Sequence, residues 1–355
     1  MTNLMQASHN WATRSADQRY ASLQDMFDTA WNRRRMAATS TVLPRDLMVV
    51  ESQDDGICLM GPTGAQAAFT NWSFSQVCSF AKMDQRTMTR LSSELAAKCV
   101  TYGLKNIRDE KPNSLLLDVK EDQSITVRAI TGTGYSRIWD FEVLDRLMAL
   151  EGKGWKVPPA FGNLPSGLYM SDRDYFVFMV NENNRIDDGS DEGLARGFFM
   201  WGSEVGKASQ GAMAFLYRYV CGNHIVWDAE VLAKIRIRHT GLASKRFWVE
   251  FNNQVNSWVE SSASNTEELI QKAKMKELGK KEEDIVDLLF SKKLLTKGQA
   301  KEVVRIAEDF SHIDGNPRSA WGVAQAITRM SQTSPHADAR TALDKTGMKV
   351  LRMAF

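Results

Sequence analysis

The chain has 355 residues, and its 45 Lys and Arg against 43 Asp and Glu leave a formal net charge of +2, so any polyanion binding must come from a local patch. Hydrophobic residues at 43% and charged residues at 25% are typical of a soluble globular protein, and the length predicts two domains or one core with appendages. The four cysteines show no CxxC spacing and the five histidines are scattered, which argues against a structural zinc site.

Hydrophobic periodicity and turn signals predict a succession of helices and strands in the first half of the chain. A helix is predicted over residues 16–38, where Tyr20, Leu23, Phe27 and Trp31 recur at helical spacing. The elements expected next are strands 46–51 and 57–60, helices 73–82 and 84–104, strands 115–119 and 124–130, and a helix 140–150 capped by Asp140. Residues 152–167, with three prolines, are predicted to form a linker-like loop.

The second half changes from strand-forming to helix-forming sequence. Strands are expected over 168–180 and 198–220, separated by a polar loop 181–193. Cys221-Gly222-Asn223-His224 predicts a turn into a strand 224–227. Interleaved opposite charges predict solvated amphipathic helices within 265–310, one of them capped by Thr296, followed by helices 319–331 and 337–353.

These elements predict an α+β fold, with an antiparallel, curved β-sheet backed by helices, a charged helical insert and a helical C-terminus. Three parts are expected: an N-terminal helical segment 1–40, an α+β core 41–260 and a helical C-terminal region 261–355. The first residues lack the pattern of a signal peptide, and no apolar run is long enough to cross a bilayer. We therefore expect a cytoplasmic protein that does not associate with membranes.

The candidate binding residues are basic and lie mainly in one segment. Lys234, Arg236 and Arg238 alternate, so in a strand they share one face while Ile235 and Ile237 point to the core. Cations beside flat rings suit a nucleic-acid backbone and its bases, although an ordinary solvated strand shows the same pattern. The predicted phosphate contacts are Lys234, Arg236, Arg238, Lys245 and Arg246, with Arg128 and Arg137 as weaker candidates, and Trp248 is the predicted stacking ring.

Motifs for catalysis are weak in this sequence. Asp172 and Asp174 would share one strand face, and with Glu204 they are candidates for a divalent metal site, or alternatively for salt bridges and turn capping. The glycines of Thr131-Gly132-Thr133-Gly134 fit neither the dinucleotide fingerprint nor the P-loop. No serine nucleophile elbow, HExxH or kinase-like set is present. We expect neither an enzyme nor a cofactor or resident metal.

A resemblance to a known family is carried by a series of short motifs between about residues 45 and 353. They are Val127-Arg128-Ala129, Tyr135, Trp139-Asp140, Ser171-Asp172-Arg173-Asp174 with residues 176–180, Arg196-Gly197-Phe198, Ser203-Glu204-Val205-Gly206, Tyr217-Arg218, Cys221-Gly222-Asn223, Trp321 and Ala326-Ile327-Thr328. This succession, densest over 168–223, resembles the phage/plasmid-like family of unknown function. Gly222 and the segment Thr131-Gly132-Thr133-Gly134 depart from the family pattern.

That resemblance implies a protein of phages, prophages or conjugative plasmids and no particular chemistry. Joined to the basic segment, it leads us to expect a protein that binds single-stranded DNA, or RNA. In style it is similar to phage single-strand annealing recombinases, which build a curved sheet backed by helices and assemble into rings or filaments. We expect phosphate contacts, base stacking and a homo-oligomer, with a host or phage recombination protein as a further partner. The alternatives are a structural or antidefence protein that uses the charged helices 265–310, and a metal-dependent nuclease.

Overall fold

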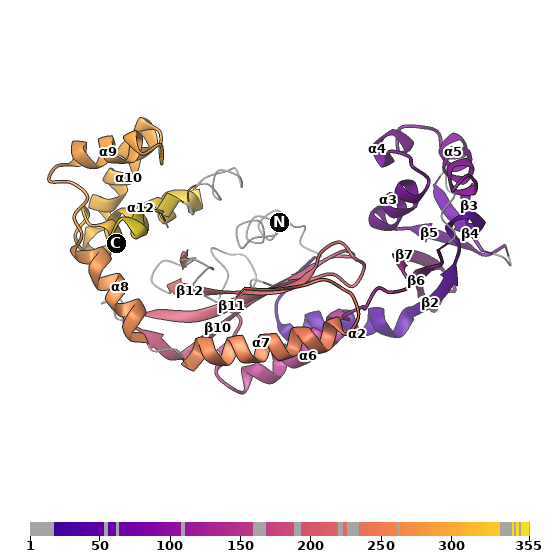
Figure 1. Ribbon diagram of the computed structural model, residues 1–355, viewed down its shortest axis with the longest axis horizontal. Coiled ribbons are helices and arrows are strands. Elements are labelled where there is room, and N and C mark those ends of the chain that lie inside the picture. The colour runs from indigo at the N-terminus through magenta and orange to yellow at the C-terminus, as the bar shows by residue number, and fades with distance from the viewer. Residues whose placement is uncertain are drawn as a thin grey trace.

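The computed structural model describes residues 18–52, 56–61, 64–107, 111–158, 168–187, 193–218, 223–225, 234–260, 263–333, 343, 346–347 and 349–354. Figure 1 shows a crescent with a central sheet, an N-terminal lobe of strands and helices at one end and a helical lobe at the other. Both lobes rise on the same side of the central sheet, while the long helices α6 and α7 run beneath it.

The central sheet contains eight strands, all paired antiparallel, in the order β1-β9-β10-β11-β12-β13, with β14 added on β12 and β8 on β10. Its strands are β1 (Arg19–Tyr20), β8 (Trp155–Lys156), β9 (Leu168–Met170), β10 (Tyr175–Ile186), β11 (Leu194–Gly202), β12 (Gln210–Arg218), β13 (Asn223–Ile225) and β14 (Lys234–Ile237). β11 is buried along its whole length because it has a paired neighbour on each side and both of its faces are covered.

One face of the central sheet packs on three helices, which are α2 (Leu23–Met36), α6 (Asp140–Glu151) and α7 (Ala243–Glu260). Alternate strand residues such as Val177 and Met200 enter this core and meet Leu144 and Phe247 from the helices. The strand residues that alternate with these, including Phe176 and Trp201, point to the other face of the sheet and are also buried. The central sheet is therefore hydrophobic on both sides, as expected of a sheet covered on both faces.

The N-terminal lobe contains a second sheet in the order β2-β6-β7-β5-β4-β3, antiparallel except for the parallel pair β5 and β7. The strands are β2 (Ala37–Val42), β3 (Met48–Glu51), β4 (Ile57–Met60), β5 (Gln66–Phe69), β6 (Asn113–Val119) and β7 (Ile125–Gly132). Helices α3 (Asn71–Phe80) and α5 (Ser93–Lys105) share a hydrophobic core with this sheet, and the short α4 (Gln85–Met88) adds Met88 to it. A 3-10 turn (Pro44–Asp46) separates β2 from β3.

The C-terminal lobe is helical and has its own core, which also includes Ile186, Leu194 and Ala214 from the end of the central sheet. Its helices are α8 (Ala263–Met275), α9 (Glu282–Ser291), α10 (Lys297–Asp309), α11 (Ser311–Asp314) and α12 (Ala320–Thr333), followed by a 3-10 turn (Arg352–Ala354). The Thr296 hydroxyl accepts a hydrogen bond from the backbone N–H of Gln299, and the side-chain Oε1 of Gln299 accepts one from the backbone N–H of Thr296, so a capping box begins α10.

Several predictions from the sequence are confirmed. The mixed α+β class, the strands around 48–51, 57–60, 113–132 and 168–180, the charged helices within 265–310 and the helix at 319–331 all agree with the structure. The first helix is confirmed over Leu23–Met36, where Ser22 accepts a hydrogen bond from the amide of Asp25. The predicted single sheet is two sheets, because the strands of the N-terminal lobe pair among themselves.

Five predictions about elements are wrong in whole or in part. Residues 19–20 and 37–38, expected within the first helix, belong to strands β1 and β2. Within the expected loop 152–167, residues 155–156 form β8, which pairs with β10. Residues 84–104 form two helices instead of one, because the Ser92 hydroxyl caps the amide of Leu95 and begins a new helix. The expected loop 181–193 belongs to β10 as far as Ile186, since the hairpin with β11 continues past Asn181 and buries Ile186. Asp140 does not cap α6, because it is the first residue of the helix and Trp139 holds the cap position.

Some predictions fall outside the described residues: the start of the first helix at 16–17, loop residues 159–167, Cys221 and Gly222 of the expected turn, residues 226–227, and most of the helix 337–353. Over the part of the chain that the structure describes, no helix is both long and apolar enough to cross a membrane.

Candidate nucleic-acid interface

The basic segment begins on β14, which pairs only with β12 among the described strands and so forms an edge of the central sheet. Ile235 and Ile237 are buried against the helices, while Arg236 and the following Arg238 are exposed. The predicted alternation is therefore correct for these four residues. Lys234 is the first residue of the strand, and its side chain lies outside the described part of the structure.

The next two cations lie on a helix. Lys245 and Arg246 are exposed near the beginning of α7, and one guanidinium nitrogen of Arg246 donates to the carbonyl of Thr240 at 2.7 Å. The first amides of a helix lack partners within it and give its N-terminus a partial positive charge. These two side chains therefore add their charge to an end of α7 that already attracts anions.

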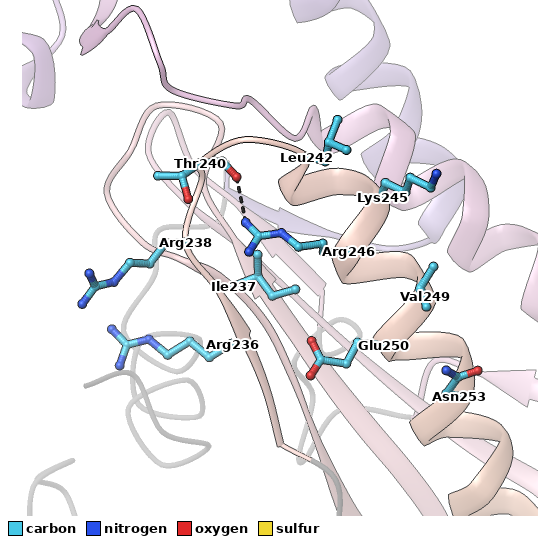
Figure 2. A pocket seen from close by; sticks show the side chains of 10 residues that line it. All are labelled: Arg236, Ile237, Arg238, Thr240, Leu242, Lys245, Arg246, Val249, Glu250 and Asn253. Carbon is cyan, nitrogen blue, oxygen red and sulfur yellow. Dashed lines mark hydrogen bonds between the residues drawn. The ribbon is translucent and has the colours of Figure 1, made fainter.

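Arg236, Arg238, Lys245 and Arg246 line one surface groove of about 860 Å³, which we call the α7 groove. Its other lining residues are Ile237, Thr240, Leu242, Val249, Glu250 and Asn253. Figure 2 shows Arg236 and Arg238 pointing to the same side, away from α7, while Arg246 lies between the strand and the helix. Within the described residues none of the four cations pairs with a carboxylate, and Glu250 is the single acid in the lining.

A second hollow of about 460 Å³ shares Arg236, Arg238 and Thr240 with the α7 groove, and we call it the ring pocket. The remaining lining residues are Tyr135, Trp201, Gly206, Lys207, Ala208, Ser209 and His239. The rings of Tyr135 and His239 stack with their centroids 4.8 Å apart, and Lys207 is exposed. The Nε of Arg236 donates to the Ser209 hydroxyl at 3.0 Å, which fixes part of the Arg236 side chain at the boundary of the two hollows.

Trp248 was predicted to stack on bases, and the structure contradicts this. Its side chain is 6% exposed and packs edge-on against Phe247 and Phe251 in the core of the central sheet. Arg146 lies over the Trp248 ring, 4.5 Å from its centroid. The segment is a helix, so residues 247, 248 and 251 turn inward while 245 and 246 remain outside.

Arg128 is not available for phosphate, contrary to the prediction. It is 3% exposed, with one nitrogen 2.5 Å from a carboxylate oxygen of Glu204 and Nε 3.4 Å from Asp118. Burial acts to lower the pKa of Arg128, but the charges of Glu204 and Asp118 raise it above its ordinary value. Arg128 is therefore a permanently charged structural residue.

Arg137 also has a structural position instead of the predicted phosphate contact. Its guanidinium donates to the backbone carbonyl of Glu204 and lies over the rings of Tyr135 and Trp139, at 5.2 and 5.4 Å from their centroids. Burial lowers the pKa of Arg137 below its ordinary value. The side chain holds the wall of the ring pocket in place rather than projecting into it.

Asp118, Arg128, Asp140 and Glu204 form a buried cluster, which we call the ion junction. It connects β6 and β7 of the N-terminal lobe to the first turn of α6 and to the turn between β11 and β12. The backbone amide of Asp140 donates to the Glu204 carboxylate at 3.2 Å. Burial raises the pKa of Asp118, and burial together with the charge of Glu204 raises the pKa of Asp140 well above its ordinary range.

The carboxylates considered for a metal site are engaged elsewhere. Asp172 lies 3.6 Å from Arg173, and Asp174 accepts a hydrogen bond from the Ser171 hydroxyl at 2.7 Å, which are the ion-pair and turn roles. Glu204 belongs to the ion junction. Among the residues that the structure describes, no group of three or more His, Cys, Asp or Glu is placed to hold a metal ion. The three carboxylates therefore do not form the constellation that the nuclease alternative requires.

Sequence reasoning missed Trp201, Lys207 and His239 as residues of the site. His239 directly follows the basic alternation, which was a usable signal. Trp201 and Lys207 come from the β11–β12 hairpin, and they reach the site because β12 is the pairing partner of β14. No protein-family model, curated protein or solved structure matches this chain, so the functional argument depends on the geometry of the site.

Proposed function

We propose that this protein binds single-stranded nucleic acid and promotes the annealing of complementary strands. The observation that carries the proposal is the α7 groove, where four exposed cations from β14, the residue after it and α7 lie without carboxylate partners among the described residues. With a net charge of only +2, the chain has concentrated uncompensated positive charge at one edge of a sheet. A row of phosphates is the ligand that such a charge distribution fits.

The proposed mechanism is physical and requires no covalent step. Phosphates bound by Arg236, Arg238, Lys245 and Arg246 release condensed counterions, so affinity falls steeply as salt rises. Arginine is suited to this role because its planar guanidinium donates two parallel hydrogen bonds to one phosphate. The exposed apolar side chains of Leu242 and Val249 in the same groove provide surface for the bases.

The proposal has two more specific parts: that the protein belongs to a mobile element, and that it anneals complementary strands. The mobile-element setting is proposed from the resemblance of short motifs to the phage/plasmid-like family. The antiparallel sheet backed by α2, α6 and α7 is consistent with an annealing protein. Annealing recombinases assemble on DNA, and a homo-oligomer would present many weak grooves along one strand. A curved sheet within a ring or filament is the arrangement we expect.

The test is fluorescence anisotropy of labelled single-stranded DNA, single-stranded RNA and duplex DNA across a salt series. We expect the wild-type protein to bind single strands most tightly, and R236E/R238E to lose binding while its thermal unfolding is unchanged. The matched control is K120E/K301E, which makes the same charge change at two exposed lysines of the two lobes. Equal binding by R236E/R238E and wild type would overturn the role of the α7 groove.

A second arm tests annealing directly. Complementary strands carrying a donor and an acceptor dye should pair faster with wild type than with R236E/R238E, and mass photometry should show oligomers on the DNA. A protein that stays monomeric and does not accelerate pairing would reduce the function to strand binding alone.

A second candidate function is partner binding through the C-terminal lobe. The side chains of Met275 and Phe290 are 75% and 47% exposed on helices α8 and α9, which are otherwise charged. This candidate takes precedence if the wild-type protein shows no salt-dependent binding to any of the three nucleic acids.

A further inference from the structure

The ring pocket differs in character from the α7 groove, although the two share a wall. The groove is lined by cations and aliphatic side chains, whereas the pocket adds three rings, those of Tyr135, Trp201 and His239. Its volume of about 460 Å³ lies within the range of about 300–1,000 Å³ that is common for small-ligand pockets. Arg236 and Arg238 place positive charge beside these rings, while Lys207 lines the pocket with its ammonium 4.8 Å from the centroid of the Trp72 ring.

The wall of the pocket is fixed before any ligand arrives. The Tyr135 hydroxyl donates to the carbonyl of Ser203 at 3.0 Å, and His239 stacks on the Tyr135 ring. Each ring nitrogen of His239 lies 3.2 Å from a backbone carbonyl oxygen, one of Ser136 and the other of Ala208. A pocket held in this way loses little conformational entropy on binding.

The floor of the pocket depends on Gly211, near the start of β12. Trp201 is 1% exposed, and an ideal Cβ on Gly211 would lie 2.2 Å from Cζ2 of its indole. Gly211 pairs with Trp201 on one side and with Arg236 on the other. The missing side chain therefore lets the indole extend across β12 toward the arginine of the edge strand.

We propose that the ring pocket holds one nucleotide unit of a bound strand, with its base against Tyr135 and its phosphate between Arg236 and Arg238. The shared wall provides continuity, because the neighbouring phosphates of the same strand lie in the α7 groove beside Lys245 and Arg246. This inference rests on the proposed function and adds a specific place for a base. Tyr135 is partly exposed and replaces Trp248 as the ring that contacts the base, while Trp201 and His239 are as buried as Trp248 and form the floor of the pocket.

The experiment fills the pocket and leaves the cations in place. A208F adds a ring at a residue that lines the ring pocket and not the α7 groove. We expect its affinity for single-stranded DNA to fall roughly fivefold or more, the loss equivalent to one base contact. The slope of log affinity against log salt should stay at the wild-type value, because the phosphate contacts remain. The matched control is A68F, the same substitution at an exposed residue of the N-terminal lobe.

The outcomes separate this inference from the proposed function. If wild type binds no nucleic acid, the proposed function fails and the inference fails with it. If wild type binds in a salt-dependent manner and A208F binds equally well, the ring pocket is not used and the α7 groove alone is responsible. A208F with a reduced salt slope would also overturn the inference, because it would show lost phosphate contacts rather than a lost base.

A second measurement uses the unmodified protein, so it does not depend on the folding of A208F. Single-stranded DNA with 5-iodouracil is crosslinked by ultraviolet light and the modified peptides are identified by mass spectrometry. We expect crosslinks at Tyr135, and crosslinks confined to α7 or the helical lobe would overturn the inference. Calorimetry with thymidine monophosphate distinguishes a site for a free nucleotide from a site for one nucleotide of a strand. Tight binding of the free nucleotide would contradict a site for one unit of a strand.

Discussion

One carboxylate oxygen of Glu204 lies 2.5 Å from the Arg128 guanidinium, and both side chains are almost fully shielded from solvent. Arg128 comes from β7 of the N-terminal lobe, while Glu204 comes from the turn between β11 and β12. The next residue of that turn, Val205, accepts a hydrogen bond from Trp72 Nε1 and packs with Leu116 and Ala129. The lobe is therefore attached to the central sheet through a charged pair with an apolar contact beside it.

Removing one partner of this pair should be costly. We predict that R128M lowers the free energy of unfolding by about 3–5 kcal/mol, because Glu204 and Asp118 would be left buried without a counter-charge. Urea unfolding followed by far-UV circular dichroism measures the change. The exposed substitution K120M is the control and should stay within about 0.5 kcal/mol of wild type. The double variant R128M/E204M should recover part of the loss, and a loss that is simply additive would show that the two side chains do not interact.

Asp140 makes stability depend on pH in a direction opposite to that of most carboxylates. Burial and Glu204 raise its pKa above the ordinary value of 3.8, with Arg128, Arg33 and Asp174 as the other charged groups acting on it. The unfolded state then releases this proton first as pH rises, so the contribution of Asp140 to stability falls above pH 3.8 until the folded group also ionises. We predict that the stability of D140N relative to wild type increases over this window and then levels off.

The control variant, D122N, should show a pH dependence of stability opposite in sign to that of D140N. The pKa of the exposed Asp122 is lowered by hydrogen bonds from Ser124, so its ionised form stabilises the folded state. D122N should therefore lose stability relative to wild type as pH rises toward 3.8 and then level off, whereas the gain of D140N develops above pH 3.8. Parallel profiles of D140N and D122N in urea unfolding at a series of pH values would contradict the assignment.

His239 should make the stability of the folded state depend on pH as well, in this case below pH 6.5. Burial lowers its pKa below 6.5 despite the two carbonyl oxygens at its ring nitrogens. The unfolded state takes up the proton first as pH falls, so wild-type stability should fall below pH 6.5 until the folded histidine is also protonated. H239Q should remove this loss, which thermal unfolding at a series of pH values would show. H312Q removes an exposed histidine of the C-terminal lobe and serves as the control. Identical profiles for the two variants would contradict the prediction.

Gly211 is predicted to tolerate no side chain. In G211A the new Cβ would overlap the Trp201 indole, and we expect a loss of ~1–3 kcal/mol because neither the paired strand nor the buried ring can move freely. G132A is the matched control, since an added Cβ there meets nothing within 4 Å. Differential unfolding of the two variants measures the effect, and near-UV circular dichroism should report the disturbed Trp201. A G211A protein as stable as G132A would show that the ring can relocate.

Much of the fold was accessible from the sequence because its signals are local. The alternation of Ile235 and Ile237 with Arg236 and Arg238 predicted correctly which side chains turn inward on β14. The capping residue Thr296 and the interleaved charges after it predicted the helices of the C-terminal lobe. The two separate sheets were not predictable in the same way, since a strand pattern shows which residues face a core and not which strand is the neighbour.

The candidate site also has some features that the sequence predicts and others that only the tertiary structure decides. Composition and alternation by themselves determined that this chain carries an exposed basic edge, because a period of two needs only neighbouring residues. Tertiary structure alone decided the fate of Arg128, Arg137 and Trp248, which look equally available in the sequence. Arg128 is buried because β6 and the β11–β12 turn bring Asp118 and Glu204 to it, and Trp248 is buried because α7 turns its aromatic face onto the sheet. Phe247, Trp248 and Phe251 became part of the core, although Lys245 and Arg246 beside them in sequence stayed exposed. Trp201 and His239, far apart in sequence, came to line one pocket with Arg236 because β12 pairs with both β11 and β14.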